Sequence, residues 1–367
     1  MKEKRTPYRF LFAGGGTGGH LFPAVAVAER IKALAPEAEI LFVGTKSKIE
    51  GRVVPQLGYK FKSIWIKGFS REINFENILF PLKVLVSIFQ SIYINMKFKP
   101  KVAIGSGGYV SGPAIIGSSV LGAKIILIEQ NSYPGVTTRL LEKYADEIHI
   151  SFEDSKKYFH HLEKLYLTGN PVRSSLSLMS KNEVLKEFNL SSNYKTLLVL
   201  GGSLGAKSIN NAVANSIKDF EENKLQVIWQ TGNNYFEQFE NLQSSFIKVF
   251  PFIEEMNTAY SACDILLARA GATTIAEILN LGIPSILVPS PNVAENHQYI
   301  NAKSLTDKNA AILIEDKNLK SELSEKIFSI IFDSGKLNEL KKNAMSLAKP
   351  DAAEMIARNA IKFAQGV

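Results

Sequence analysis

Hydrophobic residues along this chain alternate between short β-rich runs and longer runs with helical spacing. This alternation is typical of parallel βαβ units. In the first half, the short runs predict strands at residues 9–13, 39–43, 61–66, 102–104, 124–128 and 147–150. After a turn-rich break at residues 169–173, the pattern restarts with strands predicted at 196–200, 226–230, 247–250, 265–268, 285–288 and 311–314. The sequence therefore predicts an α/β fold in which the second half repeats the plan of the first.

The first predicted strand leads into a glycine-rich turn. Residues 10–23 read FLFAGGGTGGHLFP, with five glycines between positions 14 and 19 and His20 directly after them. Glycine is needed where the backbone turns with positive φ or approaches a ligand closely. The amides at the start of the following helix favour an anion or a developing negative charge. This stretch therefore predicts a ligand-binding loop with a histidine beside it.

A dinucleotide site is one candidate for this loop, because Gly14, Gly16 and Gly19 satisfy the G-x-G-x-x-G spacing. Such a site needs an acidic residue at the end of the second strand, where it binds a ribose. Here that strand ends in Gly44 and Thr45. A nicotinamide oxidoreductase is therefore disfavoured.

Further polar or glycine-rich stretches follow other predicted strands. They are residues 105–113, the cluster Glu129-Gln130-Asn131, residues 201–206 with Ser203, and residues 269–277 with Glu277. Open α/β sheets bind ligands at the carboxyl ends of their strands, so these stretches are candidate binding loops. The alternative for Glu129 is a solvated loop carboxylate, and for Glu277 a solvated helix carboxylate.

The most apolar helical stretch spans residues 75–101, with lysines and an arginine around it. Its three- and four-residue spacings are those of a core-facing helix. The alternative is a helix whose apolar side touches a membrane while the basic residues meet anionic headgroups. Residues 1–172 hold 23 Lys and Arg against 14 Asp and Glu, whereas residues 173–367 hold 20 against 21. The basic half could meet nucleic acid, anionic lipid or a phosphorylated substrate, and charge alone does not choose among them.

Composition sets the remaining limits. A length of 367 residues suggests about two domains. The single cysteine, Cys263, rules out an internal disulfide and fits a reducing compartment. The N-terminal residues lack the apolar region of a signal peptide. Residues 102–123 are uncharged over a long stretch, but their glycines and Pro113 disfavour a spanning helix, so we expect a cytoplasmic chain without a transmembrane segment.

Six motifs occur in order along the chain and together resemble one family. They are GGTGGH at 15–20, GSGGYVSGP at 105–113, EQN at 129–131, GNPVR at 169–173, GGSLGA at 201–206 and RAGATTIAE at 269–277. The sequence resembles the MurG family of undecaprenyl-diphospho-muramoylpentapeptide N-acetylglucosaminyltransferases. The resemblance implies a GT-B type fold, in which two Rossmann-like domains with parallel sheets face a deep cleft. It divides the chain into an acceptor-binding and membrane-associating domain at 1–172, a UDP-N-acetylglucosamine-binding domain at 173–345, and a C-terminal helix at 346–367 packing across the boundary.

The resemblance also implies a set of site residues. His20 and Glu129 would be catalytic, while Gly16, Tyr109 and Ser111 would bind the acceptor. The donor would contact Thr17, Gly18, Gly19, Asn131, Arg173, Ser203, Ile253, Ala272, Thr273, Thr274, Ile275, Ala276, Glu277 and Gln298. Within this set, Arg173 and Ser203 would hold the diphosphate, Ile253 the uracil, Glu277 the ribose and Gln298 the sugar.

The implied reaction is attack of the acceptor 4-hydroxyl on the anomeric carbon of the donor sugar, with inversion and loss of UDP. It requires a base near the nucleophile and compensation for charge on the diphosphate. The sequence has no Asp-x-Asp pair to hold a metal, so we expect helix N-termini, Arg173 and Ser203 to stabilise that charge without metal or other cofactor. A histidine titrates near neutral pH, which makes His20 the candidate base, with Glu129 as the second candidate.

The expected partners are UDP-N-acetylglucosamine, the muramoyl-pentapeptide carried on undecaprenyl diphosphate, and an anionic membrane surface, but no nucleic acid. The expected location is the cytoplasmic face of the cell membrane, as a peripheral protein. Two alternatives stay open. A related glycosyltransferase with another acceptor would keep the donor motifs, and a non-catalytic sugar-nucleotide-binding protein would tolerate loss of His20.

Overall fold

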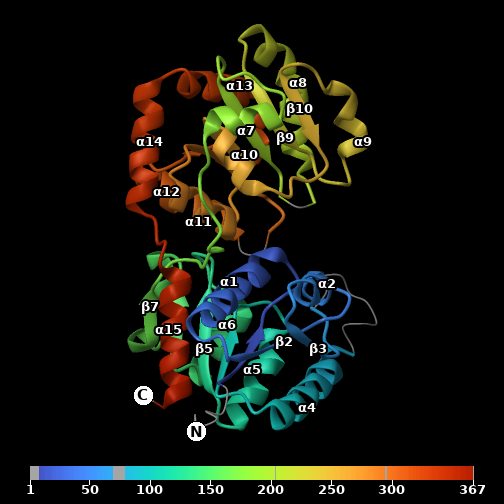
Figure 1. The fold of residues 1–367 in the computed structure, drawn as a ribbon, viewed down its shortest axis with the longest axis vertical. Coiled ribbons are helices and arrows are strands. Elements are labelled where there is room, and N and C mark those ends of the chain that lie inside the picture. Colours follow the sequence, from blue (N-terminus) through green and yellow to red (C-terminus); the bar gives the residue numbers. More distant parts are fainter. Residues whose placement is uncertain (1–7, 69–78, 203, 294–295, 367) are drawn as a thin grey trace. The chain divides into compact units, whose positions relative to one another are not determined.

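The chain folds into two compact units (Figure 1). A computed structural model describes residues 8–68, 79–202, 204–293 and 296–366. The first unit comprises residues 1–174 together with 349–367, and the second comprises residues 175–348. The first segment of the first unit ends at residue 174, two residues after the predicted bound at 172. The second unit ends at residue 348, three residues after the predicted bound at 345. The assignment of one unit to the acceptor and the other to the donor stays a prediction.

The first unit is built on a seven-stranded parallel sheet in the order β3-β2-β1-β4-β5-β6-β7. Its strands are β1 (Arg9–Ala13), β2 (Glu39–Gly44), β3 (Lys60–Ser63), β4 (Val102–Gly105), β5 (Lys124–Glu129), β6 (Glu147–Ile150) and β7 (Leu165–Leu167). Its helices are α1 (Gly18–Leu34), α2 (Ile49–Gln56), α4 (Phe80–Phe98), α5 (Ser111–Val120), α6 (Val136–Leu141) and α15 (Ala352–Gln365). Short 3₁₀ helices lie at Glu142–Tyr144, Glu153–Tyr158 and Leu162–Lys164.

The second unit is built on a six-stranded parallel sheet in the order β10-β9-β8-β11-β12-β13. Its strands are β8 (Thr196–Leu200), β9 (Gln226–Gln230), β10 (Ile247–Phe250), β11 (Ile265–Arg269), β12 (Ser285–Val288) and β13 (Ile312–Leu313). Its helices are α7 (Lys181–Glu187), α8 (Lys207–Glu222), α9 (Phe236–Phe239), α10 (Met256–Ala262), α11 (Ala272–Leu281), α12 (His297–Thr306), α13 (Leu319–Ile331) and α14 (Ser334–Ser346), with 3₁₀ turns at Glu240–Leu242 and Asp316–Asn318.

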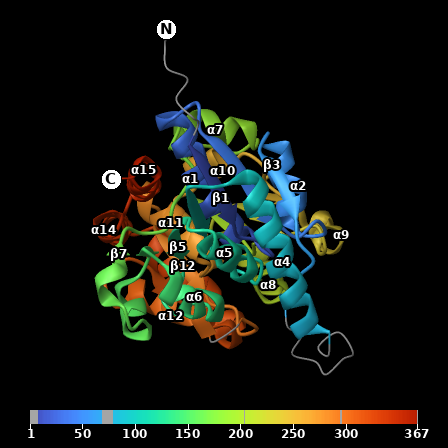
Figure 2. The same cartoon turned by 90° about the horizontal axis from the view of Figure 1, so that it is seen from below.

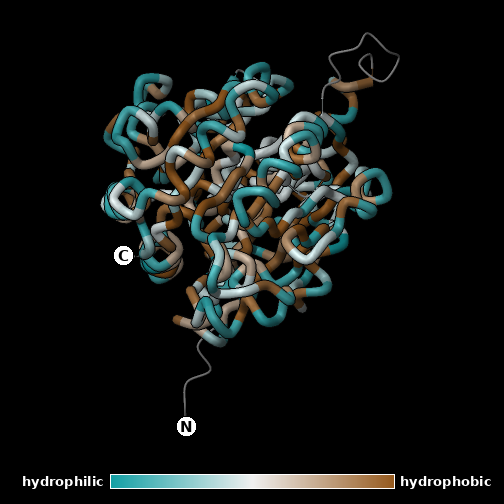
Figure 3. Tube along the Cα trace, turned by 90° about the horizontal axis from the view of Figure 1, so that it is seen from above, coloured by the Kyte–Doolittle hydropathy of each residue, from teal (hydrophilic) through white to brown (hydrophobic). Residues whose placement is uncertain are grey.

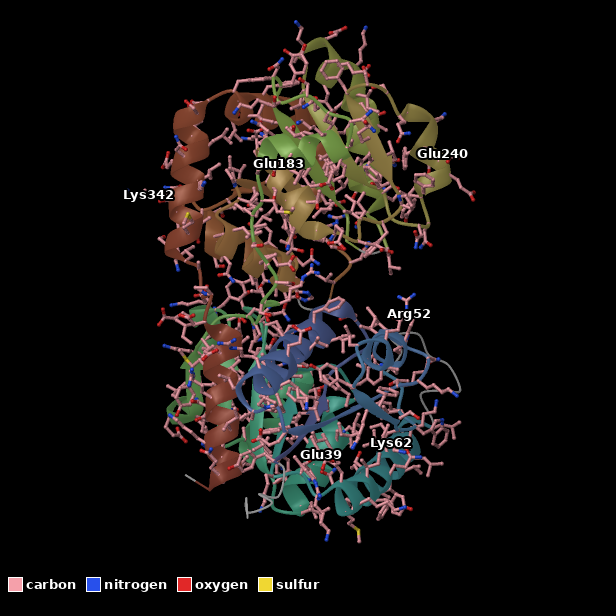
Figure 4. All side chains as sticks on the ribbon, viewed as in Figure 1. Glu39, Arg52, Lys62, Glu183, Glu240 and Lys342 are labelled. Carbon is pink, nitrogen blue, oxygen red and sulfur yellow. The ribbon has the colours of Figure 1, made fainter. Side chains whose placement is uncertain are left out.

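Both sheets are covered on both faces, as all-parallel sheets require. Alternate residues of β1 show this, since Phe10 and Phe12 belong to one buried cluster with α1 and α15, whereas Leu11 and Ala13 belong to another with α5. Figure 3 shows hydrophobic segments alternating with hydrophilic ones along the Cα trace. Charged side chains such as Lys62, Glu240 and Lys342 are exposed and extend outward (Figure 4).

Every predicted strand is present, four of them ending one residue later than predicted, and further differences occur at three places. The predicted strand at 61–66 is too long, because β3 ends at Ser63 and the buried residues Ile64 and Ile66 pack into the core from irregular backbone. The strand β7 was not predicted, since its residues are partly or well exposed and show no apolar alternation. The last strand is shorter than the predicted 311–314.

Helix α15 returns the chain to the first unit. Ile356, Ala357 and Ala360 are buried against the cluster that also contains α1 residues. Arg30 on α1 pairs with Glu354, and the Asn359 amide donates to Glu147 on β6 over 2.9 Å. The preceding helix α14 belongs to the second unit, so the chain changes unit between residues 348 and 349.

Helix α4 presents an unusual distribution of side chains. Its buried stripe is polar and consists of Lys83, Ser87, Ser91 and Asn95, while large apolar side chains lie on its exposed side. The polar stripe packs against α5, which lies beside it (Figure 2), where the Ser118 hydroxyl donates to Asn95 Oδ1 over 2.8 Å. The side chains at 45–62% exposure are Leu79, Leu82, Leu85, Phe89, Tyr93 and Met96.

The prediction of a core-facing helix at 75–101 is therefore only partly right. Partly buried residues such as Val84 and Ile94 do pack on the core, but the most apolar side does not. Residues 75–78 of this stretch lie outside the described residues. No helix in the described part of the chain combines the length and apolar character needed to cross a membrane.

Candidate active site

Each sheet reverses its strand order at one point, and the glycine-rich loops lie there. In the first sheet the reversal falls between β1 and β4, which pair with each other, and in the second between β8 and β11. Loops at the carboxyl ends of such strand pairs form the ligand crevice of open α/β sheets. The predicted loops at 14–19, 105–113, 201–206 and 269–277 follow these four strands.

In the first unit, the glycine loop after β1 is held by a buried carboxylate. Glu50 on α2 is 1% exposed, and its two carboxylate oxygens accept hydrogen bonds from the backbone N–H of Gly16 and of Thr45, each over 2.9 Å. Glu50 was not predicted from the sequence, because its only signal is an acidic residue in the first turn of a short helix. This contact fixes the backbone on which Gly16, Thr17 and His20 stand.

The loop after β4 interlocks with the first loop. The Ser106 hydroxyl donates to the carbonyl oxygen of His20 over 2.7 Å. Gly108 has φ +78°, and a Cβ there would lie 2.4 Å from the carbonyl oxygen of Gly15, so only glycine fits. Ser111 is buried and donates to the carbonyl oxygens of Ala13 and Gly107. Its hydroxyl thus serves the loop itself, and a contact of Ser111 with the acceptor stays a prediction.

His20 lies at the start of α1 and is half-buried. Its Nδ1 lies 3.1 Å from the carbonyl oxygen of Ser106 and 3.2 Å from Oε1 of Gln130. Among the residues that the structure describes, hydrogen bonds reach the ring only through Nδ1. The ring is therefore oriented by one nitrogen and leaves the other, Nε2, for chemistry.

Glu129 ends β5 and is 2% exposed. Its Oε1 accepts from the backbone N–H of Asn131 over 3.0 Å, and its Oε2 accepts from that of Gly135 over 3.0 Å. Both carboxylate oxygens are thus engaged by the loop that follows the strand. Glu129 shapes the position of Asn131, and this arrangement supports His20 over Glu129 as the base.

Tyr109 lies beside the first glycine loop. A Cβ at Gly16 would lie 3.4 Å from its ring. Burial raises the pKa of Tyr109, while the neighbouring Thr45 hydroxyl opposes this. Arg173 also belongs to the first unit. Burial of Glu29 on α1 raises the pKa of its carboxyl group, and the positive charge of Arg173 opposes this rise. The first unit therefore brings together the residues Gly16, Thr17, Gly18, Gly19, His20, Tyr109, Ser111, Glu129 and Asn131 on its loops after β1, β4 and β5.

In the second unit, one buried amide joins two of the predicted donor-binding segments. Gln230 ends β9, is 4% exposed, and donates from Nε2 to the carbonyl oxygen of Gly202 over 3.2 Å. Its Oε1 accepts from the backbone N–H of Ile253 over 2.8 Å. The N–H of Ile253 is thereby used within the protein, which leaves its carbonyl oxygen as the backbone group for a ligand. Ser203 lies outside the described residues.

The motif at 269–277 forms the turn from β11 into α11. Arg269 is fixed within the protein, because its guanidinium donates to the carbonyl oxygens of Val288 and Pro289, to Asp316 and to the Ser208 hydroxyl. It anchors the turn rather than facing a ligand. The remaining motif residues Ala272, Thr273, Thr274, Ile275, Ala276 and Glu277 form the first two turns of α11, with the side chains of Ala272 and Ile275 buried in the core.

Two side chains of the second unit are positioned by neighbours. The Tyr260 hydroxyl donates to a carboxylate oxygen of Glu277 over 2.7 Å. Gln298, in the first turn of α12, accepts from the backbone N–H of Ser290 through Oε1 over 2.9 Å. Tyr260 and Gln230 were not predicted from the sequence, since single buried polar residues carry no spacing signal. Gln130 was predicted only as part of the polar cluster at 129–131, without a role of its own.

Helices α1, α8 and α11 are three of the helices that begin at these loops without a side-chain cap. The N-cap residues Thr17 of α1, Ala206 of α8 and Gly271 of α11 form no side-chain hydrogen bond to the helix amides. First-turn amides without such a cap need another partner, and they carry the positive end of the helix dipole. These three helix starts are therefore suited to bind phosphate groups or developing negative charge.

Comparison with known proteins agrees with this arrangement. Residues 10–150 match the N-terminal domain of glycosyltransferase family 28, and residues 196–356 match its C-terminal domain. The chain is similar to the solved structure of MurG from Acinetobacter baumannii, with a TM-score of 0.77 and 26% identity over 97% of this chain and 100% of that one. A calicheamicin glycosyltransferase shares the fold. Its structure gives a TM-score of 0.71 at 12% identity, covering 99% of this chain and 100% of the other.

Curated relatives match nearly end to end. These relatives are named UDP-N-acetylglucosamine–N-acetylmuramyl-(pentapeptide) pyrophosphoryl-undecaprenol N-acetylglucosamine transferase. The relative from Flavobacterium psychrophilum is 42% identical over 98% of both chains. The relative from Cytophaga hutchinsonii is 41% identical over 99% of this chain and 98% of the other. The relative of this name in Clostridioides difficile is 40% identical over 95% of this chain and 87% of its own. The chain therefore has the two-domain α/β fold of GT-B glycosyltransferases and belongs to glycosyltransferase family 28, within the MurG family of N-acetylglucosamine transferases.

Proposed function

We propose that this chain transfers N-acetylglucosamine from UDP-N-acetylglucosamine to the 4-hydroxyl of the muramoyl-pentapeptide carried on undecaprenyl diphosphate. The product of this step is lipid II, formed from lipid I with inversion at the anomeric carbon. The observation that carries the proposal is the end-to-end similarity to enzymes whose names state this donor and this acceptor. The related transferase with another acceptor and the non-catalytic binder gain no support from a specific observation.

The first unit would supply the base. His20 stands at a strand end among the loops, with Nδ1 occupied by two oxygen atoms and Nε2 available. In its neutral form, such a ring takes the proton from the attacking hydroxyl through Nε2 as the new glycosidic bond forms. The backbone around Gly16, Thr17, Gly18 and Gly19 would approach the reacting sugars, and Tyr109 and Asn131 would contact them from the neighbouring loops.

The second unit would hold the donor. We assign the ribose diol to Glu277, uracil to the carbonyl group of Ile253, and the sugar to the amide group of Gln298. A carboxylate accepting from ribose hydroxyls forms charge-assisted hydrogen bonds, which are about twice as strong as neutral ones. The turn at 271–274 and the loop at 201–206 supply backbone amides for the diphosphate.

Charge develops on the diphosphate as the bond to the sugar breaks. Backbone amides at uncapped helix starts are fixed before the reaction, so they stabilise this charge without reorganisation. Arg173 and Ser203 would add a guanidinium and a hydroxyl group.

The acceptor remains attached to a polyprenyl chain, so the enzyme must meet a lipid surface. The exposed apolar side of α4 is the surface we assign to this contact, because large residues there are solvent-exposed while Ser87, Ser91 and Asn95 face inward. Lys97 follows on the same helix with its ammonium group 4.5 Å from the Tyr93 ring centre. Such a mixture of apolar and basic groups is typical of surfaces that insert into the interface of an anionic bilayer. The protein would then work as a peripheral protein on the cytoplasmic face of the membrane.

The test is product analysis with UDP-N-acetylglucosamine and a lipid I analogue that carries a short polyprenyl chain. We expect UDP release and a disaccharide product with a β-linkage to the 4-oxygen of the muramoyl residue. UDP release without that product would favour a different acceptor. Donor binding with no turnover on any lipid-linked acceptor would favour a non-catalytic binder and contradict the proposal.

A further inference from the structure

We propose that Gln130 is a positioning residue that holds the proton of neutral His20 on Nδ1, and so keeps Nε2 available as the basic atom. The proposal rests on the proposed function, in which His20 is the base. Gln130 is the middle residue of the EQN motif at the end of β5, and it touches the ring of His20 from the strand end.

The orientation of the Gln130 amide follows from its surroundings. Its side chain is buried, at 2% exposure. One end of the amide lies 2.9 Å from the carbonyl oxygen of Ser106 and 3.3 Å from that of Ile128. Carbonyl oxygens only accept hydrogen bonds, so this end must be the NH₂ group. The other end, which faces His20, is consequently the oxygen atom Oε1.

The His20 ring is therefore placed against two acceptors. Nδ1 lies 3.2 Å from Oε1 of Gln130 and 3.1 Å from the carbonyl oxygen of Ser106. A neutral imidazole carries its proton on one nitrogen only, and the nitrogen that faces two acceptor oxygens must be the protonated one. The opposite tautomer would turn a bare nitrogen lone pair toward two oxygen lone pairs.

The contribution of Gln130 is distinct from that of Ser106. The Ser106 carbonyl oxygen accepts from both Gln130 and His20, so it is shared between two donors. The loop also leaves room for the ring only because residue 107 is glycine, since a Cβ there would lie 2.7 Å from Nδ1. Removing the Gln130 oxygen would leave a single shared acceptor, and the ring would lose much of its preference for the Nδ1–H form.

The test combines nuclear magnetic resonance with kinetics on the full chain. The chain is labelled with ¹⁵N-histidine, and the signals of His20 are identified by their absence from the His20→Gln variant. The variants are Gln130→Leu, which removes both ends of the amide, and Gln130→Glu, which keeps an acceptor toward Nδ1. The matched control is Gln226→Leu in the second unit, because Gln226 is equally buried and bridges the N–H and carbonyl groups of Ser191.

We expect wild-type His20 to be in the Nδ1–H form when neutral, and Gln130→Leu to show a mixture of both tautomers. The kcat of Gln130→Leu should fall by between about tenfold and a hundredfold, less than for loss of a base, with the donor KM within about twofold. The control should lose thermal stability but keep the His20 tautomer and the pH profile. A Gln130→Leu variant that keeps the Nδ1–H form would overturn the proposal.

The Gln130→Glu variant tests the proposal even if Gln130→Leu does not fold. In Gln130→Glu, the oxygen that replaces the NH₂ group faces the carbonyl oxygens of Ser106 and Ile128, so it holds a proton and the buried carboxyl group stays neutral. The other oxygen still accepts from Nδ1, so the Nδ1–H form should persist. A mixture of tautomers in Gln130→Glu would contradict the inference. A tautomer that changes in Gln130→Leu without any change in kcat would instead remove His20 from the role of base, and so sink the proposed mechanism while leaving the positioning intact.

Discussion

Tyr260 donates its hydroxyl hydrogen to a carboxylate oxygen of Glu277 over 2.7 Å. Tyr260 is 2% exposed and stands on α10, so it fixes one oxygen of a partly exposed carboxylate on α11. A carboxylate held in this way needs no reorientation when it binds a diol. The relationship leads to a prediction for both residues.

Replacing Glu277 with Ala should weaken UDP-N-acetylglucosamine binding by about 1.5–3 kcal/mol, the value of a charge-assisted hydrogen bond. Tyr260→Phe should weaken it by less, about 0.5–1.5 kcal/mol, because the carboxylate remains but is no longer held. Calorimetric titration with the donor measures both, and Tyr194→Phe in the same unit is the matched control. Unchanged affinity in Glu277→Ala would remove the ribose assignment.

Glu50 is predicted to stabilise the first unit through its two backbone hydrogen bonds. The amide of Glu50→Gln would turn one donor group toward the N–H of Gly16 or Thr45, so the unfolding free energy should fall by about 1–3 kcal/mol. Glu39→Gln is the control, since Glu39 is partly exposed and its ion pairs with Arg9 and Lys60 contribute little. Urea unfolding compares the two, and equal midpoints would show that Glu50 is not a support of the loop.

Turnover is predicted to continue in excess EDTA. The sequence has no Asp-x-Asp pair, and the starts of α8 and α11 offer amides for the diphosphate. These groups stabilise the leaving UDP by fixed dipoles. Initial rates with and without chelator are the measurement. Activity that is lost with EDTA and returns with magnesium or manganese would contradict this prediction.

His20→Ala should lower turnover by about 10²–10⁴ and leave donor affinity nearly unchanged, as expected for loss of a general base. Its ring contacts Ser106 and Gln130 through Nδ1, so a loss of folding is checked by comparing thermal unfolding with that of the wild type. A decrease of less than a few-fold would direct the search for the base to Glu129 or to solvent.

The sequence predicts the strands of both sheets well, because buried parallel strands are continuous apolar runs bounded by glycine and polar residues. The strand β7 does not follow from it, because Tyr166 and Leu167 are exposed and pair only at a sheet edge. The glycine loops are visible as motifs. In contrast, Glu50, Gln130 and Gln230 act through contacts with residues 34, 110 and 23 positions away, and no local pattern records such contacts.

The inward side of α4 illustrates the same limit. Spacing shows that one side of the helix is apolar, but a core and a membrane both bury apolar side chains. In the structure, Gly117 on α5 approaches α4 so closely that a Cβ there would lie 2.9 Å from Ser91 Cβ. Small and polar residues therefore form the packed side, and the large apolar residues remain outside.

The last prediction concerns binding to a membrane through α4. Leu85 and Phe89 are 53% and 62% exposed, and burying them in the bilayer interface is favourable at any ionic strength. Lysines near an anionic surface add about 1 kcal/mol each, and this part is screened by salt. Binding to vesicles that contain anionic lipid should therefore weaken as salt rises but not vanish.

The double variant Leu85→Glu with Phe89→Glu should release the protein from these vesicles while it stays folded and binds donor, because both side chains already face solvent. The control is Lys320→Gln with Lys342→Gln in the second unit, which lowers the net charge by the same amount on exposed residues. Co-sedimentation with vesicles at two salt concentrations is the measurement.

Retention of the Glu variant on the vesicles would place the membrane contact elsewhere, and unfolding of that variant would show that this side of α4 is part of the core. Release of the control to the same extent would mean that net charge, rather than the apolar side of α4, determines binding.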